Sequence, residues 1–102
     1  MRGKACWKDA EQKSLRELDL TDDVVWALTR PEVLSALNRL PHAVPLDEYE
    51  TGVLRPESLK SAASYLREHG RLASKGLRLR FEELATFCED AHARGHAVEL
   101  SL

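Results

Sequence analysis

The sequence predicts a helix-dominated α+β fold, with residues 1–102 forming a single domain. Three observations predict this class. Apolar residues recur at helical spacing in several segments, proline and glycine punctuate those segments, and short stretches alternate apolar with polar residues. We expect about four helices and a small sheet of two or three strands. An all-α bundle is the alternative architecture.

The N-terminal part contains two helix starts. Thr21 can cap a helix that begins at the next residue, because its side-chain oxygen can accept a hydrogen bond from a free N–H of the first turn. The carboxylates of Asp22 and Asp23 in this turn are also favourable near the positive end of the helix dipole. Pro31 begins a second helix, because the first helical position needs no N–H donor, and Pro41 ends it. The stretch 15–20 could add a third strand to the sheet. Residues 1–8 precede these signals, and we expect them to fray.

The C-terminal half repeats the helix-start signal at Pro56. We expect this helix to end at Gly70 in a left-handed conformation. Residues 77–81 alternate leucine or phenylalanine with arginine, which predicts a strand, and residues 96–102 alternate again. The helix between these strands, ended by Gly95, would make a right-handed crossover if the strands are parallel.

The apolar stripes of the helices predict the core. Side chains three or four residues apart share one helix face, and the apolar face turns inward. We expect burial of Leu34, Leu37, Leu59, Leu66, Leu84, Cys88 and either Phe81 or Phe87.

Composition excludes several classes of protein. With 43% hydrophobic and 31% charged residues, the chain resembles a globular protein and not a disordered one. No apolar run approaches the roughly 20 residues that span a bilayer. The N-terminus lacks the apolar segment of a secretory signal, and two cysteines do not build a disulfide framework. We therefore expect a cytoplasmic protein with reduced thiols.

Charge alternates along the chain. Residues 55–80 carry seven bases against two acids, whereas residues 81–102 carry five acids against one base. The chain as a whole lacks the basic excess of a nucleic-acid binder, so we expect no direct nucleic-acid contact. The basic face of residues 67–80 supports a regulatory adaptor as one alternative function.

Cys88, His92 and His96 are spaced four residues apart, and cysteine and histidine at this spacing can hold zinc on one helix face. Cys88, however, lies within an apolar stripe, where a free cysteine behaves as a small hydrophobic residue. Gly95 should end the helix before His96. We therefore expect no metal and no cofactor. A small metal- or thiol-dependent enzyme at Cys88 and His92 is a second alternative function.

The segment Pro41–Arg55 lacks a helical or strand period and is longer than most loops of compact domains. Its exposed candidates combine one rigid aromatic with three carboxylates, which suits recognition of a basic protein surface. These residues are Asp47, Glu48, Tyr49 and Glu50. Their chemistry resembles that of small nuclease-immunity proteins, which present tyrosine among carboxylates. We expect a non-enzymatic protein–protein interaction module, and specifically an immunity- or antitoxin-type inhibitor of a basic toxin or nuclease.

This hypothesis predicts that Tyr49 supplies much of the binding free energy. A Tyr49→Ala variant should bind the partner about 2 kcal/mol more weakly, as truncation of an interface hot spot does. Titration calorimetry measures the affinity, and the unfolding free energy of the variant shows whether the tyrosine supports the fold instead. Unchanged affinity in a folded variant that replaces Asp47, Glu48, Tyr49 and Glu50 together would reduce this segment to a spacer.

Overall fold

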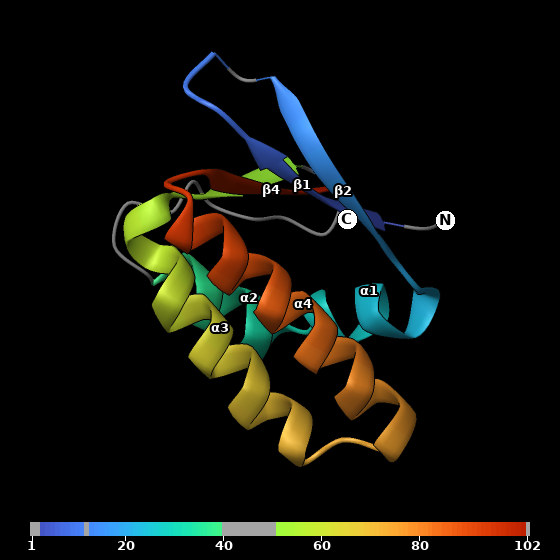
Figure 1. Cartoon of the computed structure of the whole chain (residues 1–102). Helices are drawn as coiled ribbons and strands as arrows, with labels where there is room; N and C mark the ends of the chain where they lie inside the picture. Colours follow the sequence, from blue (N-terminus) through green and yellow to red (C-terminus); the bar gives the residue numbers. More distant parts are fainter. Residues whose placement is uncertain (1–2, 12, 40–50, 102) are drawn as a thin grey trace.

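The structure, a computed structural model, describes residues 3–11, 13–39 and 51–101. In these ranges four helices lie on one face of a four-stranded antiparallel sheet (Figure 1), which confirms the α+β class. The strands are β1 (Gly3–Lys8), β2 (Ser14–Leu20), β3 (Thr51–Leu54) and β4 (Ala97–Ser101). The helices are α1 (Asp22–Leu28), α2 (Pro31–Asn38), α3 (Pro56–Arg71) and α4 (Lys75–Ala93). None of these four helices has both the length and the apolar character needed to cross a membrane.

The sheet has the order β2-β1-β4-β3, so the first and last strands along the chain lie side by side at its centre. Every neighbouring pair is antiparallel. Ala5 of β1 lies opposite Leu100 of β4, and both side chains belong to the core. Cys6 lies opposite Glu17 and Glu99, on the face that points away from the helices. The pleat therefore separates an apolar face from a charged face.

Gly3–Lys8 forms an inner strand, so the expectation that residues 1–8 fray is wrong for this part of the segment. Ala5 and Trp7 are buried in the core. The indole N–H of Trp7 donates a hydrogen bond to the carbonyl oxygen of Phe87 at 3.0 Å. A terminal segment is ordered when burial and hydrogen bonds tie it down, and both do so here.

Residues 77–81 belong to α4, so the strand predicted at this position is wrong. The alternating stretch also places Leu77 and Phe81 four residues apart, which is the spacing of one helix face. Leucine and arginine are, in addition, strong helix formers. Phe81 is buried whereas Leu79 is 61% exposed, as positions on different sides of a helix should be. Without a strand here, the predicted parallel crossover does not form, and the sheet is antiparallel throughout its described strands.

Thr51–Leu54 forms the edge strand β3 within a segment that was predicted to be a loop. Leu54 lies opposite Val98 of β4, and both side chains are buried. Within the described residues the sheet therefore has four strands instead of the predicted two or three. Residues 40–50, which contain the predicted binding residues, lie outside the described residues.

Three helices, α1, α2 and α3, begin where the sequence predicted. Pro31 and Pro56 each occupy the first turn, after a residue in extended conformation. The predicted core is confirmed for every residue whose side chain is described. Buried are Leu37, Leu59, Leu66, Leu84, Cys88 and both Phe81 and Phe87. The side chain of Leu34 lies outside the described ones.

Gly95 ends α4 as predicted, with a φ of 73° in the left-handed region that glycine adopts readily. The N–H of His96 donates to the carbonyl oxygen of Ala91 at 2.9 Å. The N–H of Gly95 itself donates to the carbonyl oxygen of His92 at 3.1 Å. These two hydrogen bonds form a Schellman motif, which satisfies carbonyl groups at the end of the helix and turns the chain into β4.

Gly70 has a different role from the predicted left-handed stop. It lies inside α3, which continues to Arg71. A Cβ atom at residue 70 would lie 2.9 Å from the Cβ of Phe81, closer than packed carbon atoms approach. Glycine is therefore needed at this position because α3 and α4 come into close contact.

This contact predicts opposite effects for two Gly→Ala substitutions. Gly70→Ala should lower the free energy of unfolding by about 1–3 kcal/mol, because the added methyl group overpacks the site at Phe81. Gly76→Ala is the matched control, since a Cβ there meets nothing within 4 Å. It should stabilise α4 by up to about 1 kcal/mol, because alanine is the better helix former. Chemical denaturation measures both, and equal effects would contradict a tight α3–α4 contact.

Candidate functional site

A hollow of about 360 Å³ lies between α1 and the turn that connects α3 to α4. We call it the Trp26 hollow. Its lining residues include the apolar Trp26, Ala27, Leu72 and Leu77, the charged Asp23 and Arg30, and His69. Trp26 is 72% exposed and Leu72 is 90% exposed, so two large apolar side chains of this region face solvent.

The helical period of α1 explains why Trp26 is exposed. Val24, Ala27 and Leu28 are the buried residues of this helix, and their spacing of three and four defines its inner face. Trp26 lies off this face. At the end of the helix, the hydroxyl of Thr29 donates to the carbonyl oxygen of Trp26 at 3.0 Å. In the sequence, the position of Trp26 outside the apolar stripe of α1 is the signal that could have marked it as a site residue.

Trp26 and Arg30 also line a second, smaller hollow of about 180 Å³, together with Thr29 and Pro31. The indole therefore contributes to two adjacent depressions. Tryptophan and arginine are among the residue types most enriched among side chains that dominate binding free energies. The two depressions around Trp26 thus have the composition of an interaction site.

The wall of the Trp26 hollow formed by α3 is held by aromatic contacts. The ring of His69 stacks against Tyr65, with ring centroids 6.0 Å apart. It also meets Phe81 edge-on, with centroids 5.6 Å apart. Because Phe81 is buried, these contacts tie His69 to the core, and the surface beside Leu72 has a rigid support.

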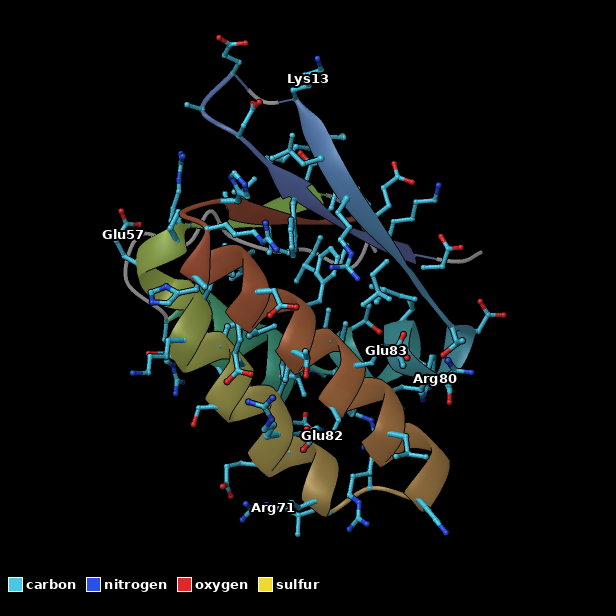
Figure 2. The ribbon with its side chains drawn as sticks, in the orientation of Figure 1. Lys13, Glu57, Arg71, Arg80, Glu82 and Glu83 are labelled. Atoms are coloured by element: carbon cyan, nitrogen blue, oxygen red, sulfur yellow. The ribbon has the colours of Figure 1, made fainter. Side chains whose placement is uncertain are left out.

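A groove of about 370 Å³ lies between β2 and α4, and we call it the β2–α4 groove. Its apolar lining residues are Leu18, Leu79 and Phe87, and its charged lining residues are Arg16, Glu82, Glu83 and Asp90. Three carboxylates against one guanidinium make this groove acidic. In Figure 2, Glu83 lies on the side of α4 toward α1, whereas Glu82 lies on the side toward α3.

Trp7 contacts residues on both sides of the β2–α4 groove. Its ring lies 5.4 Å from the ring of Phe87, centroid to centroid, in addition to the hydrogen bond from its indole N–H. The guanidinium carbons of Arg16 and Arg94 lie 5.2 Å and 5.6 Å from the centroid of the indole. Cations over an indole ring are attracted by its electron-rich face. Arg16 of β2 and Phe87 of α4 are therefore fixed to the same buried side chain.

The predicted basic face of residues 67–80 is partly neutralised by ion pairs. Arg67 donates two hydrogen bonds to Glu89, at 2.6 Å and 2.7 Å, and a third to Glu82 at 2.9 Å. These bonds raise the pKa of Arg67, and the bonds from Arg67 lower the pKa of Glu89. Arg71 lies 3.3 Å from Glu68. Two of the cations thus balance acids of α3 and α4.

Arg78 and Arg80, two further arginines of the basic stretch, lie on different sides of α4. Arg78 and Arg80 are both exposed, but they belong to α4 and are two residues apart. Side chains two positions apart on a helix diverge by about 200°, so they do not share a face. A strand would have placed them on the same side. Arg78 and Arg80 therefore do not lie together on one side of the molecule, as the predicted strand at 77–81 would place them.

Cys88 and His92 lie in different surroundings. The Cys88 thiol is fully buried in the core, and this burial, followed by the charge of Glu89, raises its pKa to about 12. His92 is exposed, and its Nδ1–H donates to the carbonyl oxygen of Pro56 at 2.7 Å. His96 packs against Trp7, with ring centroids 6.0 Å apart. The three side chains have separate contacts, and no group of three potential metal ligands occurs among residues 3–11, 13–39 and 51–101.

The predicted binding residues Asp47, Glu48, Tyr49 and Glu50 lie outside the described residues, so their role stays a prediction. The two described surfaces come from other segments. Each one combines elements that are distant in the sequence, α1 with the α3–α4 turn and β2 with α4. Sequence periodicity within one element does not reveal such a combination.

The buried thiol of Cys88 should resist alkylation in the folded protein. A raised pKa keeps the thiol protonated as the pH rises from 7 to 9, and only the thiolate attacks iodoacetamide. A Cys6→Ser variant leaves Cys88 as the single thiol, and mass spectrometry follows its modification. We expect the rate to follow the fraction of unfolded protein, controlled by adding denaturant. Modification that is fast without unfolding would show that Cys88 is an accessible nucleophile.

Comparison of the chain with known proteins yields no relative. No protein-family model matches the sequence, no curated protein matches it, and no solved structure matches it. A function can therefore be argued only from the surfaces and contacts of this chain.

Proposed function

We propose that this protein is a non-enzymatic protein–protein interaction module whose binding surface is centred on Trp26. The observation that carries the proposal is the 72% exposure of Trp26 beside Leu72, which is 90% exposed. Large apolar side chains that gather on a surface around a depression mark interaction sites more often than isolated exposed residues do. Binding a partner would remove both side chains from water.

The composition of the Trp26 hollow suits a specific contact. Trp26 offers a large apolar ring with a polar N–H, and Arg30 offers a guanidinium at the edge. A partner could place an apolar side chain against Trp26 and Leu72 and an acceptor near Arg30. Apolar anchors with polar groups around them are the usual anatomy of an interface centre.

The support beneath the hollow also favours binding. His69 is fixed by Tyr65 and Phe81, and Ala27 belongs to the buried face of α1. A preorganised surface loses less conformational entropy when a partner binds, so more of the contact free energy appears as affinity.

An immunity- or antitoxin-type inhibitor of a basic toxin or nuclease is the finer form of this proposal. Its support is the acidic and aromatic composition of Asp47–Glu50. The acidic character of the β2–α4 groove is a second reason to consider a basic partner. A thiol enzyme at Cys88 has less support, because the sulfur atom is buried and its pKa is high.

Substitution of Trp26 tests the proposal. The immobilised wild-type protein is used to capture binding proteins from the native host, and the same capture is repeated with Trp26→Ala. For a partner purified in this way, Trp26→Ala should weaken binding by roughly 2 kcal/mol, or about thirtyfold in Kd. The free energy of unfolding should change little, because the indole is 72% exposed.

A matched control removes an exposed apolar side chain elsewhere. Leu15 of β2 is 46% exposed and does not line the Trp26 hollow, so Leu15→Ala should leave the affinity unchanged. Leu72→Ser should weaken binding as Trp26→Ala does. A partner that binds wild type, Trp26→Ala and Leu72→Ser equally well would refute this surface.

A further inference from the structure

The sheet has one long edge beside the β2–α4 groove. β2 comprises seven residues, lies at the end of the strand order, and pairs with β1 alone among the described strands. The other edge strand, β3, comprises four residues. Along an edge strand, alternate residues direct their N–H and C=O groups away from the neighbouring strand. β2 therefore offers the longer row of backbone donors and acceptors.

We propose that the β2–α4 groove binds an extended, lysine- or arginine-rich segment of a protein partner, which joins the sheet as a further strand beside β2. Strand addition of this kind takes affinity from backbone hydrogen bonds and specificity from alternate side chains. The inference concerns a different surface from the Trp26 hollow and does not depend on it.

The charged side chains of the β2–α4 groove indicate that its occupant is basic. The groove contains the carboxylates of Glu82, Glu83 and Asp90, and that of Glu82 pairs with Arg67. Glu83 and Asp90 have no ion-pair partner among the described residues. The one cation, Arg16, has its guanidinium over the indole of Trp7. As far as the described residues show, two free carboxylates therefore face an incoming strand.

The spacing of the two free carboxylates suits an extended segment. Glu83 and Asp90 are seven residues apart on α4, which corresponds to about 10 Å along the helix axis. Side chains on one face of a strand recur about every 7 Å, and lysine adds a long flexible stem. Basic residues two or four positions apart on the segment can therefore reach both acids.

The floor of the groove accounts for the apolar part of the contact. Leu79 is 61% exposed, and Leu18 is partly buried beside it. The aliphatic stems of lysine or arginine can cover these side chains while their charged ends reach the carboxylates. Phe87 closes the floor and is fixed by Trp7.

A second copy of this chain is a poorer occupant than a basic partner. Pairing of β2 with another β2 would bring in Glu17 and Asp19 and a second set of acids from α4. Like charges that face each other across strands are destabilising.

Three labelled peptides test the proposal by fluorescence anisotropy at low ionic strength. The first is a blocked nonapeptide that alternates threonine with lysine and begins and ends with threonine, the second has glutamate for every lysine, and the third has proline for the central threonine. The lysine peptide should bind and the glutamate peptide should not. The proline peptide keeps the charge but loses one N–H donor, so it should bind roughly fivefold more weakly.

Substitutions inside and outside the β2–α4 groove test where the lysine peptide binds. Glu83→Gln combined with Asp90→Asn should weaken binding of the lysine peptide roughly tenfold. Glu57→Gln is the matched control at the start of α3, away from the groove (Figure 2), and should not change it. The Trp26→Ala variant should also bind the lysine peptide with the affinity of the wild type. A failure of the proposal for the β2–α4 groove is therefore distinguishable from a failure of the proposal for the Trp26 hollow. Amide exchange by NMR should slow within β2 when the lysine peptide is bound.

Several results would overturn the inference. The lysine peptide could fail to bind, or bind the Glu83 and Asp90 double variant as tightly as wild type. Equal binding of the proline peptide, together with no slowing of amide exchange in β2, would reduce the contact to unspecific charge attraction. Protection of β2 amides that rises with protein concentration without peptide would show that a second copy occupies the edge.

Discussion

The fold depends on the burial of Trp7 between the sheet and α4. Its indole N–H reaches the carbonyl oxygen of Phe87 at 3.0 Å, which joins residues 80 positions apart in the chain. A buried N–H without an acceptor would cost about 1–3 kcal/mol, so this contact also fixes the orientation of the ring. Because β1 lies between β2 and β4, anchoring it to α4 sets where the whole sheet sits on the helices. The β2–α4 groove exists because of this placement.

A second constraint joins the two long helices. Gly70 allows α3 to approach Phe81 of α4, and on the surface Arg67 connects α3 to Glu82 and Glu89. Hydrogen bonds from Arg67 keep the pKa of Glu89 below its ordinary value. Their contribution to stability is therefore present above the carboxyl pKa of the unfolded chain and is lost as the pH falls through the lower folded pKa. The same pairing removes charge from a surface that would otherwise be basic.

The two candidate surfaces are related to this scaffold in different ways. At the Trp26 hollow, apolar side chains lie outside the core because α1 is short and uses its inner face for Val24, Ala27 and Leu28. At the β2–α4 groove, a strand edge and a row of carboxylates lie outside the core because the sheet ends there. One surface suits an apolar anchor and the other a basic strand. Both are supported by buried aromatic residues, Phe81 in the first and Phe87 in the second.

The sequence by itself determined the helix starts at Pro31 and Pro56, the stop at Gly95 and the apolar stripes, because these depend on backbone geometry and on side chains within a few residues. It did not determine whether residues 77–81 form a strand or a helix, because their spacing fits both periods and only packing of Leu77 and Phe81 against the core selects the helix. Tertiary structure alone decided that Gly3–Lys8 lies within the sheet, since its partners are β2 and the distant β4. It also decided the candidate surfaces, because Trp26 and Leu72 line one hollow, and Leu18 and Leu79 line one groove, only after elements far apart in the chain have packed together.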